Sequence, residues 1–138
     1  MKRRILTTSL AAFAALMVVI QLVPNRLETG PVTQEPAWDP STRELAQRAC
    51  FDCHSNQGEL PWYGRVAPVS WVVTHHIDEG REHLNFSEMD RPQEEAHEAA
   101  EELLEGEMPP AYYLLTHPEA RLSEAETKQL AEGLQRAL

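Results

Sequence analysis

Two cysteines and a histidine stand together as Cys50-x-x-Cys53-His54, and no other cysteine occurs in the chain. Cys50 and Cys53 lie about one helical turn apart, which places both thiols on the same side of a helix. This spacing is the attachment signal for c-type haem, in which two thiols bind one porphyrin and the next histidine binds its iron. The motif therefore predicts one covalent haem c per chain, held by Cys50 and Cys53, with His54 as an axial iron ligand.

Three other uses of the Cys50–Cys53 pair are a disulfide, half of a zinc site and a thioredoxin-like redox pair. A structural zinc site usually needs a second Cys or His pair at ligand spacing, and none is evident here. A thioredoxin motif belongs to a βαβ unit, and the sequence shows no convincing strand. Haem attachment is the use that the pattern favours.

The sixth iron position decides what such a haem can do. Met108 is the first candidate, since it stands in the segment Gly106-Glu107-Met108-Pro109-Pro110, where two prolines restrict the backbone. A thioether is a soft sulfur ligand, and His/Met ligation raises the reduction potential relative to His/His. Met108 could also simply fill a gap in the core. Met89, His76 and an open iron position are the rival possibilities.

The N-terminus has the composition of a membrane anchor. Lys2-Arg3-Arg4 precedes an apolar run, Ile5–Val23, whose 19 residues would form a helix about 28 Å long, close to the thickness of a bilayer core. A cleaved signal peptide is the alternative, but no small-x-small site follows the run. Residues 1–23 are therefore predicted to be an uncleaved, single-pass anchor in a bacterial inner membrane. The positive-inside bias places everything after Val23 in the periplasm, where thioether haem is attached.

Charge restricts the partners of the exported part. All 22 acidic residues follow Arg26, against eight of the 12 basic residues, which gives this part a net charge of about −14. Such a surface repels phosphates, so a nucleic-acid partner is not expected. It is compatible with a basic redox partner protein, although it also serves simply to keep the domain in solution.

The remaining sequence predicts a Pro-rich tether over residues 24–40 and a haem-binding domain over 41–138. The domain is expected to be all-α, a small cytochrome c-like arrangement of helices around one covalent haem. Hydrophobic periodicity and capping patterns predict four helices. These begin at Ser41 with Glu44 as capping partner, after Pro68, at about Pro92 and ending before Gly106, and at Ser123 with Glu126 as capping partner.

The second predicted helix carries an apolar stripe that includes Val69, Val72 and His76. Further side chains are candidates for the haem pocket. Aromatic residues soon after the motif could wall the porphyrin, and two arginines could pair with its propionates or balance nearby carboxylates. These side chains are Trp62, Tyr63, Trp71, Arg65 and Arg81.

These segments together resemble the bacterial haem-binding domain family of small, membrane-anchored c-type proteins. The resemblance covers residues 36–138 and includes the motif around Cys53-His54, the run Asn85-Phe86-Ser87-Glu88, the Met108-Pro109-Pro110 segment and Tyr113. It implies covalent haem through both cysteines, His54 as proximal ligand, Met108 as distal ligand and a short cytochrome c-like fold. Leu60 and Met89 depart from the family pattern, which often has aromatic residues there.

The function expected from these features is single-electron transfer by a membrane-anchored monohaem protein rather than catalysis. A closed His54/Met108 site suits this role because the ligand number need not change with the oxidation state. With an open iron, the protein would instead be a peroxidase-like enzyme, for which His76 and Arg81 are the candidate acid/base groups, or a sensor of haem or a gas.

Overall fold

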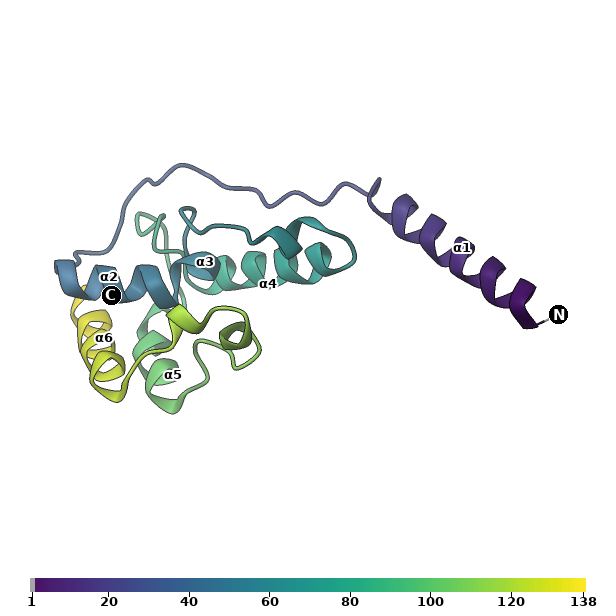
Figure 1. The fold of residues 1–138 in the computed structure, drawn as a ribbon. Helices are drawn as coiled ribbons and strands as arrows, with labels where there is room; N and C mark the ends of the chain where they lie inside the picture. The colour runs from purple at the N-terminus through teal and green to yellow at the C-terminus, as the bar shows by residue number, and fades with distance from the viewer. Residues whose placement is uncertain (1) are drawn as a thin grey trace.

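The computed structural model describes residues 2–138, and the described residues contain six α-helices and no β-strand. The predicted all-α fold is confirmed. Helices α2 to α6 pack into one body, while α1 projects from its side (Figure 1). The helices are α1 (Lys2–Ile20), α2 (Pro40–Ala49), α3 (Phe51–His54), α4 (Val69–His83), α5 (Ala99–Glu105) and α6 (Glu124–Ala137).

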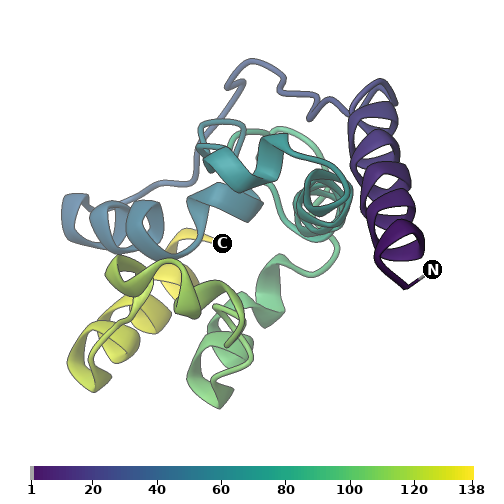
Figure 2. The ribbon, with the colours of Figure 1, turned by 45° about the vertical axis from the view of Figure 1, so that its right-hand side comes forward.

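Helix α1 is long and apolar enough to cross a membrane. None of its described side chains is buried against the rest of the chain. Figure 1 shows its N-terminal end pointing away from the other helices, and Figure 2 shows α1 as a separate helix at the side of the domain. The hydrogen-bonded turns continue past Ile20 to Val23, where the apolar run ends. The predicted boundaries of the anchor (1–23), tether (24–40) and haem-binding domain (41–138) stay predictions.

Local capping chemistry sets the start of α2 and of α6. The capping box of Ser123 and Glu126 is present at α6, as the sequence predicted. At α2 the predicted Ser41 cap is wrong, because the Asp39 carboxylate accepts a hydrogen bond from the backbone N–H of Thr42 at 3.0 Å. Pro40 then occupies the first helical position, where its fixed φ and missing N–H are tolerated. The hydroxyls of Ser41 and Thr42, together with the backbone N–H of Thr42, donate to the Asp39 carboxylate and lower its pKa.

The third predicted helix is shorter than expected at its start. A 3-10 turn, Ala96–Glu98, leads into α5, and Gly106 ends α5 in the left-handed conformation (φ 81°), as predicted. Gln93 is the reason for the late start. Its side-chain oxygen accepts from the Asn85 N–H at 2.8 Å and its amide donates to the Glu88 carbonyl at 2.9 Å. These bonds hold the preceding segment in a loop.

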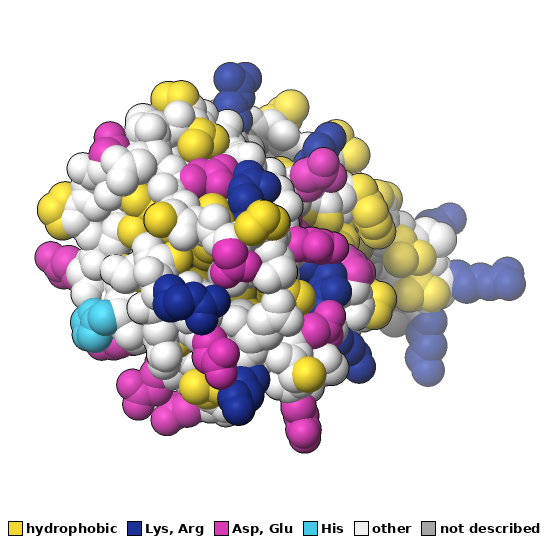
Figure 3. Space-filling view, turned by 90° about the vertical axis from the view of Figure 1, so that its left-hand side faces the viewer, with side chains coloured by type: hydrophobic (Ala, Val, Ile, Leu, Met, Phe, Trp, Pro, Cys, Tyr) yellow, Lys and Arg dark blue, Asp and Glu magenta, His cyan; other side chains and the backbone are white. Residues whose placement is uncertain are grey.

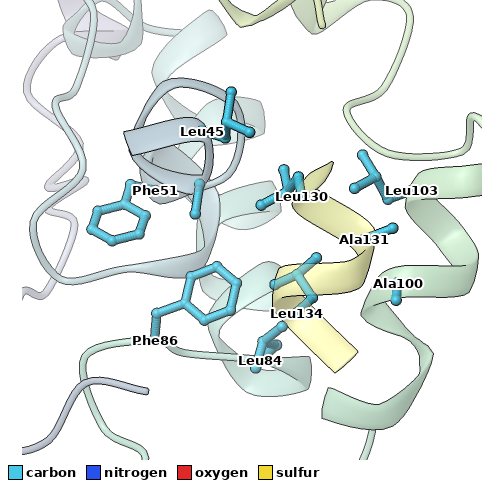
Figure 4. Packing of buried hydrophobic residues seen from close by; sticks show 10 residues of the cluster. Leu45, Phe51, Leu84, Phe86, Ala100, Leu103, Leu130, Ala131 and Leu134 are labelled. Atoms are coloured by element: carbon cyan, nitrogen blue, oxygen red, sulfur yellow. The ribbon is translucent and has the colours of Figure 1, made fainter. Parts of the chain in front are cut away.

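The core lies where α2, α5 and α6 meet the loop after α4 (Figure 4). Phe86 and Leu130 are almost completely buried there, and each contributes about 1.5–3 kcal/mol by leaving water. Helices α2 and α6 approach closely because Gly133 faces the Thr42 side chain, with no room for a β-carbon between them. The cluster consists of Leu45, Ala46, Phe51, Leu84, Phe86, Ala100, Leu103, Leu130, Ala131 and Leu134.

The chain between α1 and α2 contains no helix in the described structure and runs across the surface of the domain (Figure 1). It is hydrogen-bonded to the domain at intervals along its length. The contacts are Gln21 with Ala67, Asn25 with Thr74, the Glu28 carbonyl with Arg81, Thr33 with Ser87, and Gln34 with Met89.

Helix α4 begins after Pro68, as predicted, but its predicted apolar stripe is wrong in the first turns. Val69 and Val72 are exposed, and the buried side chains of α4 are Ser70, Thr74, Ile77 and Arg81. Thr74 and Arg81 are covered by the segment that leaves α1.

Candidate functional site

A cavity of about 450 Å³ lies between α3, α4, α5 and the loop that follows α5. Cys50, Cys53, His54 and Met108 all line it, although Met108 is 54 residues from His54 in sequence. The lining is mainly apolar, and the volume lies within the range of cofactor sites, about 300–1,000 Å³. The structure thus brings together the four residues predicted from the sequence to hold haem.

The two thiols come from the junction of α2 and α3. Cys50 ends α2 and Cys53 lies in the short α3, whose turn is closed by the N–H groups of Cys53 and His54 donating to the Cys50 carbonyl. Both cysteines are free thiols. Burial raises the pKa of Cys50 to about 12 and that of Cys53 to about 11, so both are neutral at pH 7.

Gly80 allows α3 to lie against α4. A β-carbon at this position would come within 3.0 Å of the Cys53 carbonyl oxygen and 3.4 Å of the Cys53 β-carbon. Glycine therefore allows the close approach at the point where the motif crosses α4, and a larger residue would require a shift there.

The His54 imidazole is held by backbone carbonyls. Its Nδ1 lies 2.9 Å from the Gly80 oxygen and 3.0 Å from the Leu84 oxygen. Carbonyl oxygens only accept, so Nδ1 carries the proton and Nε2 keeps its lone pair. Burial lowers the pKa of His54, which favours the neutral ring. A neutral imidazole whose other nitrogen donates to a carbonyl is the arrangement typical of a metal-binding histidine.

The rivals of Met108 are placed differently from each other. Met108 is 41% exposed and lines the cavity from the loop after α5. His76 also lines the cavity, and its Nδ1 lies 3.3 Å from the Tyr112 hydroxyl. Met89 packs against the hydrophobic core and is not part of the cavity lining. Met89 is therefore the weakest of the three candidates for the sixth iron ligand.

Tyr113 joins the Met108 loop to the cysteine motif. Its hydroxyl donates to a carboxylate oxygen of Asp52 at 2.8 Å, and the other Asp52 oxygen accepts from the Glu59 N–H at 3.1 Å. Burial and the neighbouring Asp52 raise the pKa of Tyr113, so it stays a donor. Sequence reasoning noted Tyr113 only as part of the family pattern and did not predict this contact, because 61 residues separate the partners.

The aromatic and arginine candidates for the haem pocket lie outside the cavity lining, and the carboxylates of Asp78 and Glu88 lie near Arg81, in line with the alternative of charge balance. Trp62, Tyr63 and Trp71 do not line the cavity, and nor do Arg65 and Arg81. Arg81 donates to the carbonyls of Glu28 and Ser55, and Arg65 to that of Leu60. The side chains that sequence reasoning missed come from the loops and helices that close the cavity. They are Leu84, Phe86, Leu103, Tyr112, Tyr113 and Leu134.

The lining also includes acidic side chains from α4, α5 and the turn before α5. Glu79, Glu95, Glu98 and Glu102 all contribute, and Glu95 pairs with His83 at 2.6 Å. A site bordered by several carboxylates attracts cationic groups of a partner.

Comparison with known proteins gives one match. The profile described as a haem-binding domain matches residues 15–136, which is most of the chain. Searches of curated proteins and of solved structures find no match. The matched range includes both cysteines, His54 and Met108, all of which line the mainly apolar cavity. The chain therefore belongs to the haem-binding domain family.

Proposed function

We propose that this haem-binding protein is a membrane-anchored, monohaem c-type electron carrier. The observation that carries the proposal is the convergence of Cys50, Cys53, His54 and Met108 on one cavity. In this site Cys50 and Cys53 would form the thioether links, His54 would bind iron through Nε2, and Met108 would supply the sixth ligand. Haem bound there supplies the one-electron couple of its iron.

The protein residues contribute positioning and exclusion of water. The carbonyls of Gly80 and Leu84 fix the His54 tautomer and the plane of its ring. Tyr113 holds the Met108 loop to the motif through Asp52. Phe86, with the leucines that line the cavity, keeps the surroundings apolar, which tunes the potential of a bound metal centre.

The apolar N-terminal helix supports electron transfer at a membrane surface. Helix α1 is long and apolar enough to span a bilayer, and its basic start favours a cytoplasmic N-terminus. The haem-binding domain would then lie in the periplasm. The carboxylates that line the cavity suit a redox partner with a basic contact surface, and the acidic domain would steer such a partner toward it.

One observation keeps a catalytic or sensing role as a second candidate. His76 lines the same cavity and contacts the Tyr112 hydroxyl. If Met108 did not bind iron, His76 would be the group available to move a proton in peroxidase-like chemistry. A ligand exchange at the iron would be the basis of a sensor.

The optical spectrum of the ferric protein, made in a host that matures c-type haem, tests the ligand assignment. We expect the weak long-wavelength charge-transfer band of a thioether bound to ferric iron. Met108→Ala should abolish this band, while Met89→Ala and His76→Ala should leave it. A high-spin wild-type spectrum without the band would favour the open-site alternatives.

A carbonate wash of membranes that contain the full chain tests the anchor separately. The protein should stay in the pellet with its haem. Release of a shortened, soluble product would show that the apolar run is cleaved as a signal peptide.

A further inference from the structure

We infer that the loop before α4, together with the first two turns of α4, forms a second membrane contact, which lays the domain against the lipid headgroups. The inference rests on the anchoring part of the proposed function. The contact surface consists of Trp62, Val66, Val69 and Val72, and is called the apolar patch below.

Gln21 provides the link between this patch and the membrane. It lies inside the apolar run, two residues before Val23. Its side-chain amide donates to the Ala67 carbonyl at 3.0 Å, and its side-chain oxygen accepts from the Ala67 N–H at 3.0 Å. The two ends of one amide thus bind one residue of the loop. This contact holds Ala67 at the depth where the span leaves the membrane. Together with the bond that the same amide donates to the Met17 carbonyl at 2.9 Å, it satisfies a polar group that is costly to leave unpaired in lipid.

The patch surrounds the residue that Gln21 holds. Val66 directly precedes Ala67, and Val69 follows it by two residues. Trp62 begins a 3-10 turn, Trp62–Arg65, that packs against α4. Trp62 is 78% exposed and Val72 is 55% exposed. Neighbouring exposed apolar side chains of this size mark an interaction surface, and tryptophan is enriched at the membrane–water boundary.

The distribution of charge agrees with contact to lipid. In a domain rich in carboxylates, the 18 residues between Glu59 and Asp78 contain no acidic residue and one basic residue, Arg65. Negative surface potential disfavours carboxylates near anionic headgroups and attracts arginine. The side of the domain turned away from α1, by contrast, carries acidic and basic side chains together (Figure 3).

Further hydrogen bonds keep the domain in this orientation. The Asn25 amide donates to the Thr74 hydroxyl at 2.8 Å, and Arg81 donates to the Glu28 carbonyl at 2.8 Å. Both contacts lie on α4, so the helix that borders the cavity is the one fixed to the membrane segment. The patch and the cavity also share one face of α4, because Val69, Val72 and His76 follow each other at helical spacing.

Photo-cross-linking in lipid tests the patch. The full-length haem protein is reconstituted in vesicles of phosphatidylethanolamine and phosphatidylglycerol, with p-benzoylphenylalanine in place of Trp62 or Val72, and lipid adducts are measured by mass spectrometry. Leu104 is the matched control position, since it is apolar, 56% exposed and on α5. We expect several-fold more lipid adduct at positions 62 and 72 than at position 104.

A Gln21→Leu variant tests the link, because it keeps the span apolar and removes the amide. It should lower the adduct yield at position 72 several-fold. Equal yields at positions 62, 72 and 104 in a carbonate-resistant protein would overturn the patch while leaving the anchor intact. A protein released by carbonate would overturn both. The haem spectrum of the same sample reports separately on haem attachment.

Discussion

The Nδ1 of His54 donates to the carbonyl oxygen of Gly80 at 2.9 Å, so one imidazole connects α3 to the last turn of α4. The same Nδ1 lies 3.0 Å from the Leu84 oxygen, on the first residue after that helix. The contact fixes which ring nitrogen is free to bind a metal. The packing of α3 against α4 and the proposed binding of iron therefore depend on the same side chain.

His54→Ala should leave haem attached through the cysteines but with altered ligation. The variant loses both the proposed axial ligand and the link to α4, so its absorption spectrum should become that of a misligated haem. His75→Ala, which removes an exposed histidine of α4 that does not line the cavity, is the control and should retain the native spectrum. A native spectrum in His54→Ala would remove this residue from the ligand set.

Replacing Cys50 and Cys53 together by alanine should abolish covalent haem. Haem staining after denaturing electrophoresis measures this directly, and a stained band from the double variant would contradict the proposed attachment. The small domain would also lose the apolar surface of its cofactor. We therefore expect a lower thermal midpoint than in the wild type, followed by circular dichroism.

Gly80→Ala should both destabilise the protein and disturb the motif. The new methyl group would meet the Cys53 carbonyl oxygen at 3.0 Å, and relieving that contact requires a shift of backbone. We expect a loss of about 1–3 kcal/mol in the free energy of unfolding, together with a lower yield of holoprotein. Denaturant unfolding measures the first effect and haem absorbance per chain the second.

Gly106→Ala is the matched control for this substitution. At Gly106 no atom lies within 4 Å of a new β-carbon, but the φ of 81° is strained for alanine. The cost should be about 1 kcal/mol, without a change in holoprotein yield. An equal loss of haem in both variants would show that the effect at position 80 is general destabilisation.

Tyr113→Phe should loosen the Met108 loop. It removes the hydrogen bond to the Asp52 carboxylate while keeping the ring. We expect a loss of about 1–2 kcal/mol of stability and a weaker thioether charge-transfer band. Tyr112→Phe, on the neighbouring and more exposed ring, is the control. If the two variants had the same band intensity, the loop would not depend on the Asp52 contact.

Stability in acid should depend on Glu126. The N–H of Ser123 and the guanidinium of Arg48 lower the pKa of Glu126 from its ordinary value of 4.5 to about 2. Because the folded pKa is the lower one, the stabilisation is complete above about pH 4.5 and disappears as the pH falls toward 2.

Glu126→Gln keeps the capping geometry and removes the charge. This variant should be less stable than the wild type at pH 7, and the two should converge near pH 2. Glu124→Gln controls for net charge at the same helix start. Parallel acid-unfolding curves for wild type and Glu126→Gln would contradict this origin of acid sensitivity.

The sequence predicts those helix ends that depend on residues close together along the chain. The start of α6 follows from Ser123 and Glu126, and the end of α5 from Gly106, because each involves neighbours along one turn. The start of α5 was not predictable in this way. It depends on Gln93, whose side chain binds backbone groups in a separate loop.

In the candidate site, too, features that depend on neighbouring residues were predictable and contacts between distant segments were not. The spacing of Cys50, Cys53 and His54 predicts the haem motif, and the two prolines after Met108 make that residue a candidate ligand. The contact between Tyr113 and Asp52 joins distant segments, and nothing near either residue indicates it. Helical periodicity predicts Val69 and Val72 in the core, although both are exposed, because it cannot distinguish a buried apolar face from an exposed one.

The hydrogen bonds between the segment after α1 and the domain limit how far the haem site can travel. The 17 residues of the predicted tether, 24–40, would span about 60 Å if they were fully extended. The hydrogen bonds of Asn25, Glu28 and Thr33 to the domain leave almost none of this length free to extend. If α1 spans the bilayer as proposed, these contacts would hold the domain beside the membrane and prevent free movement through the periplasm. A redox partner of the proposed electron carrier would then meet the domain at a fixed height above the bilayer, so that encounters would become a search within the plane of the membrane.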